Sequence, residues 1–432
     1  MTETWTSWNG NICHPFSELH VPETEEDLCR IVANAPNRVR AFGNRYSSAD
    51  IAAGAETLIS LRNYRKITAV DRATKQVTVQ SGITLKELCQ SLEEMDLSFP
   101  ALPDIDDITL GGAVATGTHG TGRDAQLLSE YMIRCTLVKA DGSLEQIDTS
   151  SPKFDAVKVS LGLLGIFSTM TFQVEERSSL HIWEEPHKDI EWVRSYEKWL
   201  AKNPFLRILW MPHTNHGYVI RGNDPTAVAQ RSPLKKAPWY YRYRRNMSQF
   251  LYRKTAKIPP LTALINKCIY LLFFTRRQVK EGSLYETTVT KSRSSTLELA
   301  EWTIARKDFP RLMKALRKKL HSPFSRYFAH IPMDIRFIQK DTAWLSNAYN
   351  RDMVTVGCVT RNASKADSYK AFQLIEELFL AYGGRPHWAK RFSCGPEELA
   401  RLYPRWHDFI ELRRAEDPKG VFLTPHLEKL FA

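Results

Sequence analysis

The first 176 residues combine short apolar runs with stretches of helical spacing. Leu28, Ile31 and Val32 follow an acidic turn after Pro22, and this spacing predicts a helix with one buried face. Further helices are expected over 84–95 and near 154–161, and strands over 38–42, 57–60, 67–70, 76–80, 131–139, 144–147 and 166–174. Because these elements do not repeat as strand–helix–strand units, the pattern predicts an α+β domain.

The pattern changes from about residue 177, where strands and longer helices follow one another. Ile335 and Phe337, and then Val354, Val356 and Cys358, alternate with other residues, which is typical of a sheet with one face on a core. Strands are expected over 180–184, 206–211, 219–221, 298–305, 334–340 and 353–360, and helices over 307–319 and 364–382. The second half therefore predicts a cap domain with a mainly antiparallel sheet flanked by helices.

One further helix is expected over 261–274, where apolar side chains recur at helical spacing and predict one buried stripe. The stripe consists of Leu261, Leu264, Ile265, Cys268, Leu271 and Leu272. This helix belongs to a basic and aromatic stretch, 231–280, that contains thirteen Lys and Arg and no acid. An ordinary cap-domain helix under a solvated cationic face is favoured, and peripheral contact of the stretch with a membrane is kept as the alternative.

Glycine and threonine gather in one loop, 102–122, which holds five glycines and four threonines. Backbone N–H groups and hydroxyls in such a run supply hydrogen-bond donors, and glycine lets the backbone approach a ligand closely, so the run can wrap a pyrophosphate. A matching loop, 40–50, lies upstream. Neither loop reads GxGxxG or GxxxxGK[ST], which argues against a Rossmann or P-loop nucleotide site. A plain glycine-rich connection between strands is the alternative interpretation.

Composition bounds the class of protein. At 432 residues the chain is long for one core, and its 43% apolar and 25% charged content is that of an ordinary soluble protein, so two domains are expected. No signal-like segment and no apolar run of about 18 residues occurs. Seven scattered cysteines predict reduced thiols in a cytoplasmic protein and no metal site. The net charge of +12 would suit nucleic acid or an anionic membrane.

The segment GAVATGTHGTG, 112–122, resembles the FAD-binding loop of the vanillyl-alcohol-oxidase superfamily, in particular its sugar-1,4-lactone oxidase and alditol oxidase branch. The resemblance extends over nearly the whole chain, through the loop 40–50, GLLGIFSTMTFQV (162–174), WMPHT (210–214), EWTIARKDFP (301–310), DIRFIQKDTAWLSNAY (334–349), HWAKRF (387–392) and the tail 402–427. It implies a PCMH-type FAD-binding domain of two subdomains over 1–176, a substrate-binding cap domain over 177–385, and a C-terminal segment, 386–432, that returns to the FAD domain.

The resemblance also implies that the two loops hold FAD. The residues expected to contact the cofactor are Gly43, Asn44, Arg45, Tyr46, Ser47, Ser48, Gly111, Gly112, Ala115, Thr116, Gly117, Thr118, His119, Gly120, Gly122, Gly165, Ile166 and His387. In many relatives the first loop reads GxGHS, and its histidine carries the flavin through a covalent bond. Aligning Ser47 and Asp50 puts Tyr46 at that position, so we expect FAD to be bound without a covalent link.

Asp334 and Arg336 lie two residues apart on an expected strand, so their side chains share one face. On its own such a pair is typical of a cross-strand salt bridge. The resemblance instead implies a pair that lines the substrate site, where relatives usually have Glu in the first position. It also implies that Lys390, in HWAK, stabilises the reduced flavin or polarises the substrate oxygen, with His387 in a positional role. The candidate catalytic residues are therefore Asp334, Arg336 and Lys390.

These features predict an FAD-dependent oxidoreductase that oxidises a hydroxyl of a small, sugar-derived substrate by hydride transfer to flavin N5. Oxidation of an aldono-1,4-lactone, with O2 as acceptor and H2O2 as product, is the favoured activity. An alditol oxidase, and a specialised oxidase or dehydrogenase of secondary metabolism on the same scaffold, are the alternatives. A nucleic-acid-binding function of the basic stretch would leave both loops unexplained, so no nucleic-acid partner is predicted.

Overall fold

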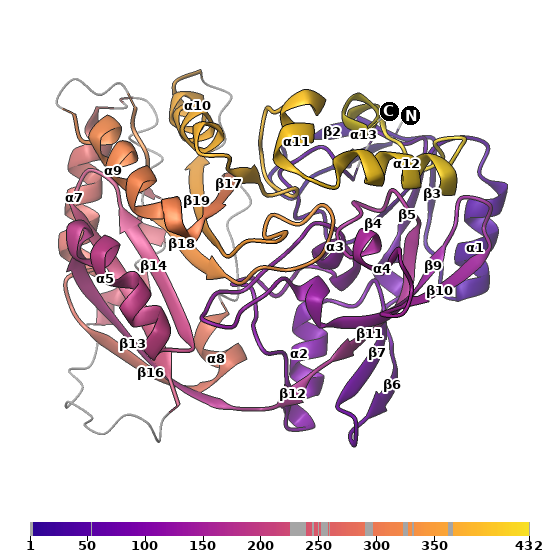
Figure 1. Ribbon diagram of the computed structural model, residues 1–432, viewed down its shortest axis with the longest axis horizontal. Helices are drawn as coiled ribbons and strands as arrows, with labels where there is room; N and C mark the ends of the chain where they lie inside the picture. The colour runs from indigo at the N-terminus through magenta and orange to yellow at the C-terminus, as the bar shows by residue number, and fades with distance from the viewer. Residues whose placement is uncertain are drawn as a thin grey trace.

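Two parts of the molecule lie side by side in Figure 1: the N-terminal segments together with the yellow C-terminal helices, and a pink and orange cap. The computed structural model describes residues 3–52, 54–224, 239–243, 246–248, 250–251, 258, 260–289, 297–322, 327–330, 332–361 and 366–431. Much of the basic stretch 231–280 lies outside this set. The candidate site residues come from both parts of the molecule.

The N-terminal part contains a parallel three-stranded sheet and an antiparallel five-stranded sheet. In spatial order the strands are β3 (Glu18–His20), β5 (Thr57–Ser60) and β4 (Val39–Phe42) in the first, and β10 (Leu144–Asp148), β9 (Met132–Val138), β11 (Ile166–Gln173), β7 (Gln76–Gln80) and β6 (Ile67–Asp71) in the second. Two-stranded pairs join β1 (Thr4–Thr6) to β2 (Cys13–Pro15) and β8 (Leu97–Ser98) to β12 (Glu175–Glu176).

The helices of this part are α1 (Glu25–Asn34), α2 (Leu85–Glu94), α3 (Leu110–Ala115) and α4 (Phe154–Val157). α2 begins where the sequence predicts because Thr84 and Glu87 each cap the other's backbone N–H group. α4 is shorter than the helix expected near 154–161. Leu161 and Gly162 have φ values of +56° and +68°, a left-handed conformation that does not continue a right-handed helix. Their carbonyl oxygens accept hydrogen bonds from Arg40, which ties this turn to β4.

The cap is built on an eight-stranded sheet whose neighbouring strands are all antiparallel. From edge to edge the strands are β16 (Gln278–Ser283), β13 (Ser179–Lys188), β15 (His216–Asn223), β14 (Phe205–Met211), β18 (Met333–Ile338), β19 (Met353–Arg361), β17 (Leu297–Ala305) and β20 (Arg385–Pro386). Its helices include α5 (Asp189–Lys202), α7 (Leu261–Phe273), α8 (Leu284–Thr288), α9 (Phe309–Leu320) and α10 (Ala366–Ala381). The expected antiparallel sheet flanked by helices is confirmed.

Alternation along β14 separates the two faces of this sheet. Leu206, Ile208 and Trp210 enter the main core, which also contains side chains of α5 and α9. Leu209 and Met211 enter a second cluster, which contains side chains of α7. α5 and α9 therefore cover one face of the sheet, and α7 covers part of the other.

Five of the six residues in the α7 stripe that the sequence predicts to be buried are exposed, so this prediction is wrong. The sixth, Ile265, is half-buried against the second cluster. Leu261, Leu264, Leu271 and Leu272 expose 41%, 58%, 60% and 49% of their surface, and Cys268 is exposed as well. The buried positions of the helix are Thr262, Asn266, Ile269, Tyr270 and Phe273.

Asn266 accounts for this orientation. It is fully buried, and its amide donates hydrogen bonds to the carbonyl oxygens of Pro212 and Ala329, both at 2.9 Å. A buried polar group needs hydrogen-bond partners. If the helix were rotated so that Asn266 faced outward, the carbonyl oxygens of Pro212 and Ala329 would lose their donor. The apolar periodicity of α7 is therefore overruled by one polar residue and its tertiary contacts.

The C-terminal segment packs on the N-terminal part. Its helices are α11 (Pro396–Leu402), α12 (Trp406–Glu416) and α13 (Pro425–Phe431), drawn in yellow above α3 and α4 in Figure 1. The Val39 N–H donates to the carbonyl oxygen of Val421, and Arg40 donates to that of Phe422. β20 straddles the expected boundary between 385 and 386 because it pairs with β17 of the cap.

The glycine- and threonine-rich loop connects the two parts. The Thr121 hydroxyl donates to the carbonyl oxygen of Leu206 in β14 and accepts the N–H of Phe337 in β18. Gly122 N–H donates to the carbonyl oxygen of Phe337 at 3.0 Å. The loop is thus fixed to two central strands of the cap, beside the candidate catalytic pair on β18.

Candidate active site

A large cavity lies where the two loops, β18 and the C-terminal segment meet. It spans about 1550 Å³, a volume that includes the space at its open mouth. The expected site residues that line it are Gly43, Asn44, Arg45, Tyr46, Ser47, Gly111, Gly112, Ala115, Thr116, Thr118, His119, Gly165, Ile166, Asp334, Arg336, His387 and Lys390. Residues from five separate segments of the chain therefore surround one space.

Four expected cofactor contacts lie outside the cavity wall: Ser48, Gly117, Gly120 and Gly122. The Ser48 N–H donates to the carbonyl oxygen of Ala389 at 2.8 Å. Gly117 has a φ of +72°, and a Cβ at Gly120 would lie 2.8 Å from the Leu102 carbonyl oxygen. These residues shape the loops, a role that the sequence does not distinguish from contact with the ligand.

The cavity wall fits a dinucleotide where the second loop turns into α3. A Cβ on Gly111 would lie 3.0 Å from Ser81, whereas a Cβ on Gly112 would meet only the Thr109 hydroxyl, at 3.5 Å. Gly112 therefore presents nearly bare backbone to the cavity. The buried hydroxyl of Ser81, another lining residue, has no hydrogen-bond partner among the described residues. Backbone N–H groups and hydroxyls from both loops suit the pyrophosphate of FAD.

Tyr46 is held firmly in the wall formed by the first loop. Its ring stacks on Trp8 with centroids 5.5 Å apart, and its hydroxyl donates to Asp107 at 3.2 Å. The neighbouring Ser47 hydroxyl donates to the carbonyl oxygen of Ala389 at 3.4 Å. The first loop is thus fixed to the HWAK segment, more than 340 residues further along the chain.

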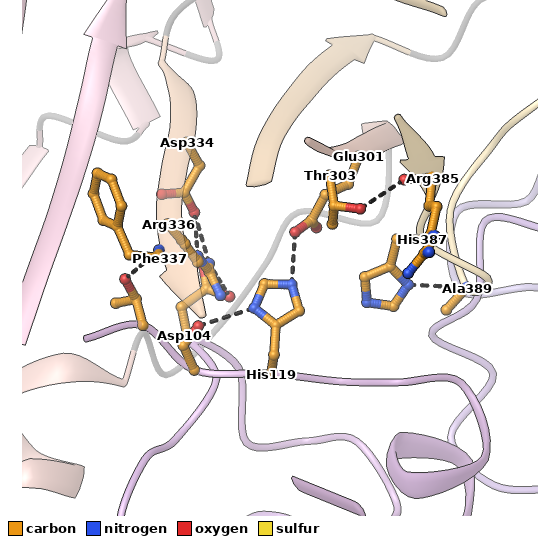
Figure 2. Close-up of polar contacts among 12 residues, drawn as sticks. Asp104, His119, Glu301, Thr303, Asp334, Arg336, Phe337, Arg385, His387 and Ala389 are labelled. Atoms are coloured by element: carbon orange, nitrogen blue, oxygen red, sulfur yellow. Dashed lines mark hydrogen bonds and ion pairs between the residues drawn. The ribbon is translucent and has the colours of Figure 1, made fainter. Parts of the chain in front are cut away.

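Four charged side chains form a closed ring at the cavity. Arg207 donates two hydrogen bonds to Asp334, both at 2.8 Å, and Arg336 donates two more, at 2.9 and 2.6 Å. Asp104 lies 3.1 Å from a guanidinium nitrogen of Arg207 and 2.9 Å from one of Arg336. Each carboxylate therefore bridges two arginines, and Figure 2 shows the Asp334–Arg336 side of this arrangement.

The ring fixes the charge of its members. Burial alone would raise the pKa of the Asp334 carboxyl, but Arg207 and Arg336 outweigh burial and lower it. Burial acts against the charge of Arg336 as well, yet Asp104 and Asp334 raise the pKa of its guanidinium. Since the two oxygens of Asp334 accept four hydrogen bonds already, this carboxylate is poorly placed to accept a substrate proton.

A second polar cluster, which Figure 2 shows beside Arg336, consists of His119, Glu301 and His387. His119 lies with Nε2 at 2.8 Å from a Glu301 oxygen and Nδ1 at 2.9 Å from the Gly120 carbonyl oxygen, so both ring nitrogens contact an acceptor. Burial would raise the pKa of Glu301, but His119 holds it well below its usual range. Burial lowers the pKa of His387 to about 3. Its Nδ1 accepts the N–H of Ala389, which leaves the hydrogen on Nε2.

The same cluster brings together side chains of the kinds that bind metals. The ligand-type atoms of His119, Glu301 and His387 lie within 4.8 Å of one another. However, His119 and Glu301 bind each other directly, and the Nδ1 lone pair of His387 is used by a backbone N–H. The contacts are those of a hydrogen-bond network in the cavity wall.

Three charged residues of the site were not predicted from the sequence: Asp104, Arg207 and Glu301. Glu301 begins the segment EWTIARKDFP, and Arg207 is the lone cation in the apolar strand FLRILWM, so each carried a signal. Asp104 lies near Asp106 and Asp107 at the front of the loop 102–122, and the sequence does not distinguish it from them. The role of Arg207 depends on the register between two strands. It lies opposite Arg336, and only the pairing of β14 with β18 brings it to Asp334.

Comparison with known proteins defines the class first. A model of the FAD-binding domain matches residues 18–148. The crystal structure of cholesterol oxidase from B. sterolicum superposes with a TM-score of 0.81 at 15% identity, covering 100% of this chain and 97% of that one, and this likeness concerns the fold. The protein is an FAD-dependent oxidoreductase with the expected α+β fold and PCMH-type FAD-binding domain.

The family follows from the rest of the chain. A model described as D-arabinono-1,4-lactone oxidase matches residues 170–430, more than half of the sequence, and the chain belongs to this family. It is similar to an L-gulonolactone oxidase from Mus musculus, at 28% identity over 99% of this chain and 98% of that protein. It is also similar to an alditol oxidase from a Streptomyces species, at 25% identity over 100% and 99%.

Proposed function

We propose that the protein oxidises a hydroxyl of an aldono-1,4-lactone, with O2 as electron acceptor and H2O2 as product. The observation that carries this proposal is Arg336, a buried cation that two carboxylates hold in the wall of the cofactor cavity. A fixed guanidinium is suited to bind and polarise a sugar-ring or lactone oxygen. The similarity to an L-gulonolactone oxidase supports a lactone as the substrate.

The two loops would hold FAD, with Gly112 and the cavity-lining threonines of the second loop, Thr109, Thr116 and Thr118, at the pyrophosphate and the first loop closing the cavity. When bound, FAD supplies the acceptor for the hydride that leaves the carbinol carbon. The protein's own task is to bind the substrate, to fix its hydroxyl and to exclude water.

Asp334 is assigned to positioning. Because its oxygens accept two hydrogen bonds from Arg336 and two from Arg207, it holds the guanidinium at a fixed place and angle. Relatives usually have the longer Glu at this position, and here Arg207 supports the shorter carboxylate from the neighbouring strand. Arg336 is then the group of this pair that touches the substrate.

Glu301 is assigned as the acceptor for the reacting hydroxyl. It lines the cavity, and one of its oxygens binds His119 while the other has no hydrogen-bond partner among the described residues. Its pKa lies well below the usual range, so the group is ionised and can accept a hydrogen bond from the substrate hydroxyl. Lys390, which also lines the cavity, would add positive charge where electrons accumulate.

FAD is proposed to be bound without a covalent link, because Tyr46 stands where relatives carry the linking histidine. Its hydroxyl bond to Asp107 and its stacking on Trp8 support a structural role for the ring. Acid precipitation of the purified protein should leave all yellow colour in the supernatant. Flavin that stays in the pellet would contradict the assignment.

A cytoplasmic location is proposed together with this activity. All seven cysteines are free, including Cys13 and Cys268 at the surface, which supports a reducing compartment. Cell fractionation with a compartment marker tests the location. Recovery of the protein from an oxidising compartment would contradict it.

The experiment that tests the activity is a panel of aldono-1,4-lactones and alditols under air, read both as H2O2 release and as reduction of an artificial acceptor. Fast turnover of a lactone with one H2O2 per product is the expected result. The second candidate is an alditol oxidase, which the similarity to the Streptomyces enzyme favours. Turnover of alditols alone would replace the first candidate by the second, and turnover only with the artificial acceptor would make the protein a dehydrogenase.

A further inference from the structure

The outward-facing side of α7 is an apolar surface. Leu261, Leu264, Leu271 and Leu272 recur at intervals of three, seven and one along the helix, and each is at least 41% exposed. Residues at such spacing lie on one side of a helix, opposite the side that Asn266 fixes to the cap. The helix therefore buries its more polar side and presents leucines.

Neighbouring residues add further apolar side chains. Trp239, Tyr243, Met247 and Phe250 are exposed at 72%, 42%, 43% and 55%. This segment adjoins α7, because Tyr240 packs on Phe273 with ring centroids 6.0 Å apart and Leu251 packs against the same cluster. Of the thirteen exposed large apolar residues in the described part of the chain, nine lie between 239 and 272. Exposed apolar area gathered in this way marks a binding surface.

The charged residues of the stretch 231–280 are all basic. Thirteen Lys and Arg and no Asp or Glu occur between 231 and 280. Among the described residues, Lys267 lies on α7 itself, and Arg276 and Arg277 follow its C-terminal end, all exposed. An apolar face rimmed by cations is the pattern of a helix that lies in the surface of an anionic membrane.

We propose that α7 and the described residues of the preceding segment, 239–243, 246–248 and 250–251, form a docking surface for an anionic lipid bilayer, with α7 lying in the plane of the interface. Among the described helices none is long and apolar enough to cross a membrane, so contact would be peripheral. A second copy of this chain is the less suitable occupant. A symmetric dimer would bring the same cationic patch against itself, and juxtaposed like charges disfavour such a contact.

Docking by this surface would have a consequence for the active site. α7 packs on the same face of the eight-stranded sheet that carries Arg207, because Arg207 alternates with Leu206 and Ile208 and shares its side with Leu209. β18, with Asp334 and Arg336, is the next strand. The lipid surface and the substrate cavity would therefore adjoin the same side of the cap.

The test is flotation of the purified, FAD-loaded full chain with vesicles of phosphatidylcholine alone or of phosphatidylcholine with phosphatidylserine, at low and high salt. The protein should float with the anionic vesicles, and less at high salt. Leu264→Ser with Leu271→Ser should lower the bound fraction by about tenfold or more, since each leucine inserts apolar area. The matched control, Leu144→Ser with Ile190→Ser, removes two exposed apolar side chains elsewhere and should bind as the parent does.

Three results would overturn the proposal. The first is a protein that stays unbound with anionic vesicles at low salt, and the second is equal binding to neutral and anionic vesicles at both salt concentrations. The third is a dimer, detected by light scattering, that the two α7 substitutions dissociate, because the leucines would then be covered by a second copy. Flavin content and turnover of both variants are measured in parallel, so that loss of binding is separated from loss of folding.

Discussion

Two regions on the same face of the eight-stranded sheet differ in which side chains they bury. Under the cavity, β14 and β18 bury a ring of four charges, Asp104, Arg207, Asp334 and Arg336, all at least partly enclosed and mutually paired. On the same face, over β14 and its neighbours β15 and β13, α7 leaves leucines exposed and buries Asn266. In both regions polar groups are inside because each has a partner there.

The difference teaches what each region is for. A closed ring of buried charge is costly to assemble and gives little net stability, but it fixes the direction of Arg336 toward the cavity. The exposed leucines contribute nothing to the core of the described structure. The charged region fits the proposed chemistry at the cavity, and the apolar region fits the proposed contact with a lipid surface.

The largest expected effect comes from opening the charge ring. Arg207→Met leaves Asp104 and Asp334 to share one cation, and the uncompensated buried charge should lower the free energy of unfolding by about 3–5 kcal/mol. Urea denaturation monitored by tryptophan fluorescence measures the change. The control is Arg311→Met, an arginine exposed at 75%, which should change stability by less than about 0.5 kcal/mol. A loss below about 1 kcal/mol for Arg207→Met would mean that the ring is not closed in solution.

Removing the substrate-facing cation should act mainly on turnover. Arg336→Ala is expected to lower kcat by about 10²–10³-fold, the usual effect of losing one fixed group that stabilises developing charge. Arg336→Lys keeps the charge but not the bidentate geometry, so its kcat should lie between those of the parent and Arg336→Ala. Flavin content is measured alongside, because an apoprotein would be inactive for another reason. A kcat within threefold of the parent in a flavin-loaded Arg336→Ala variant would remove Arg336 from the site.

Glu301 and Glu298 provide a matched pair on β17. Both are carboxylates in ion pairs, Glu301 with His119 and Glu298 with Arg391, but Glu301 alone lines the cavity. Glu301→Gln should lower kcat by about tenfold to a hundredfold, equivalent to one hydrogen bond to a charged group, and Glu298→Gln should leave kcat unchanged. Equal losses for the two variants would assign Glu301 a purely structural role.

The same carboxylate should shape the acid side of the stability profile. Because the pKa of Glu301 is lowered in the folded protein, its stabilising contribution is present above its unfolded pKa of about 4.5 and is lost as the pH falls through the folded value. The stability difference between the parent and Glu301→Gln should therefore shrink as the pH falls below about 4.5. Urea midpoints from neutral to acid pH give this difference. A difference that stays constant would contradict the lowered pKa.

The smallest effects should come from α7, and they test its inverted orientation. Asn266→Ala should lower the free energy of unfolding by about 1–3 kcal/mol, because two buried carbonyls lose their donor. Leu264 belongs to the stripe that the sequence predicts to be buried. Leu264→Ser should nevertheless change the free energy of unfolding by less than about 0.5 kcal/mol. The opposite ranking of the two variants would restore the buried leucine stripe that the sequence predicts.

Sequence patterns predicted most of the architecture. Periodicity located the central strands and several helices of both parts, but it missed α5, β16 and the C-terminal helices α11 to α13. The resemblance brought the two loops, β18 and the HWAK segment to one site. What could not be predicted depends on tertiary contacts. The orientation of α7 depends on two carbonyls distant in sequence, and the partners of Asp334 depend on the register between β14 and β18. The glycines that shape the second loop and those that face the cavity look alike in sequence.

The most direct test of the central claim is anaerobic mixing of the yellow, FAD-loaded protein with an aldono-1,4-lactone while the flavin absorbance is followed. The account predicts rapid bleaching by the parent, bleaching about 10²–10³-fold slower by Arg336→Ala, and return of the colour when air is admitted. A flavin that stays oxidised with every lactone and alditol, or one that Arg336→Ala reduces as fast as the parent, would contradict it.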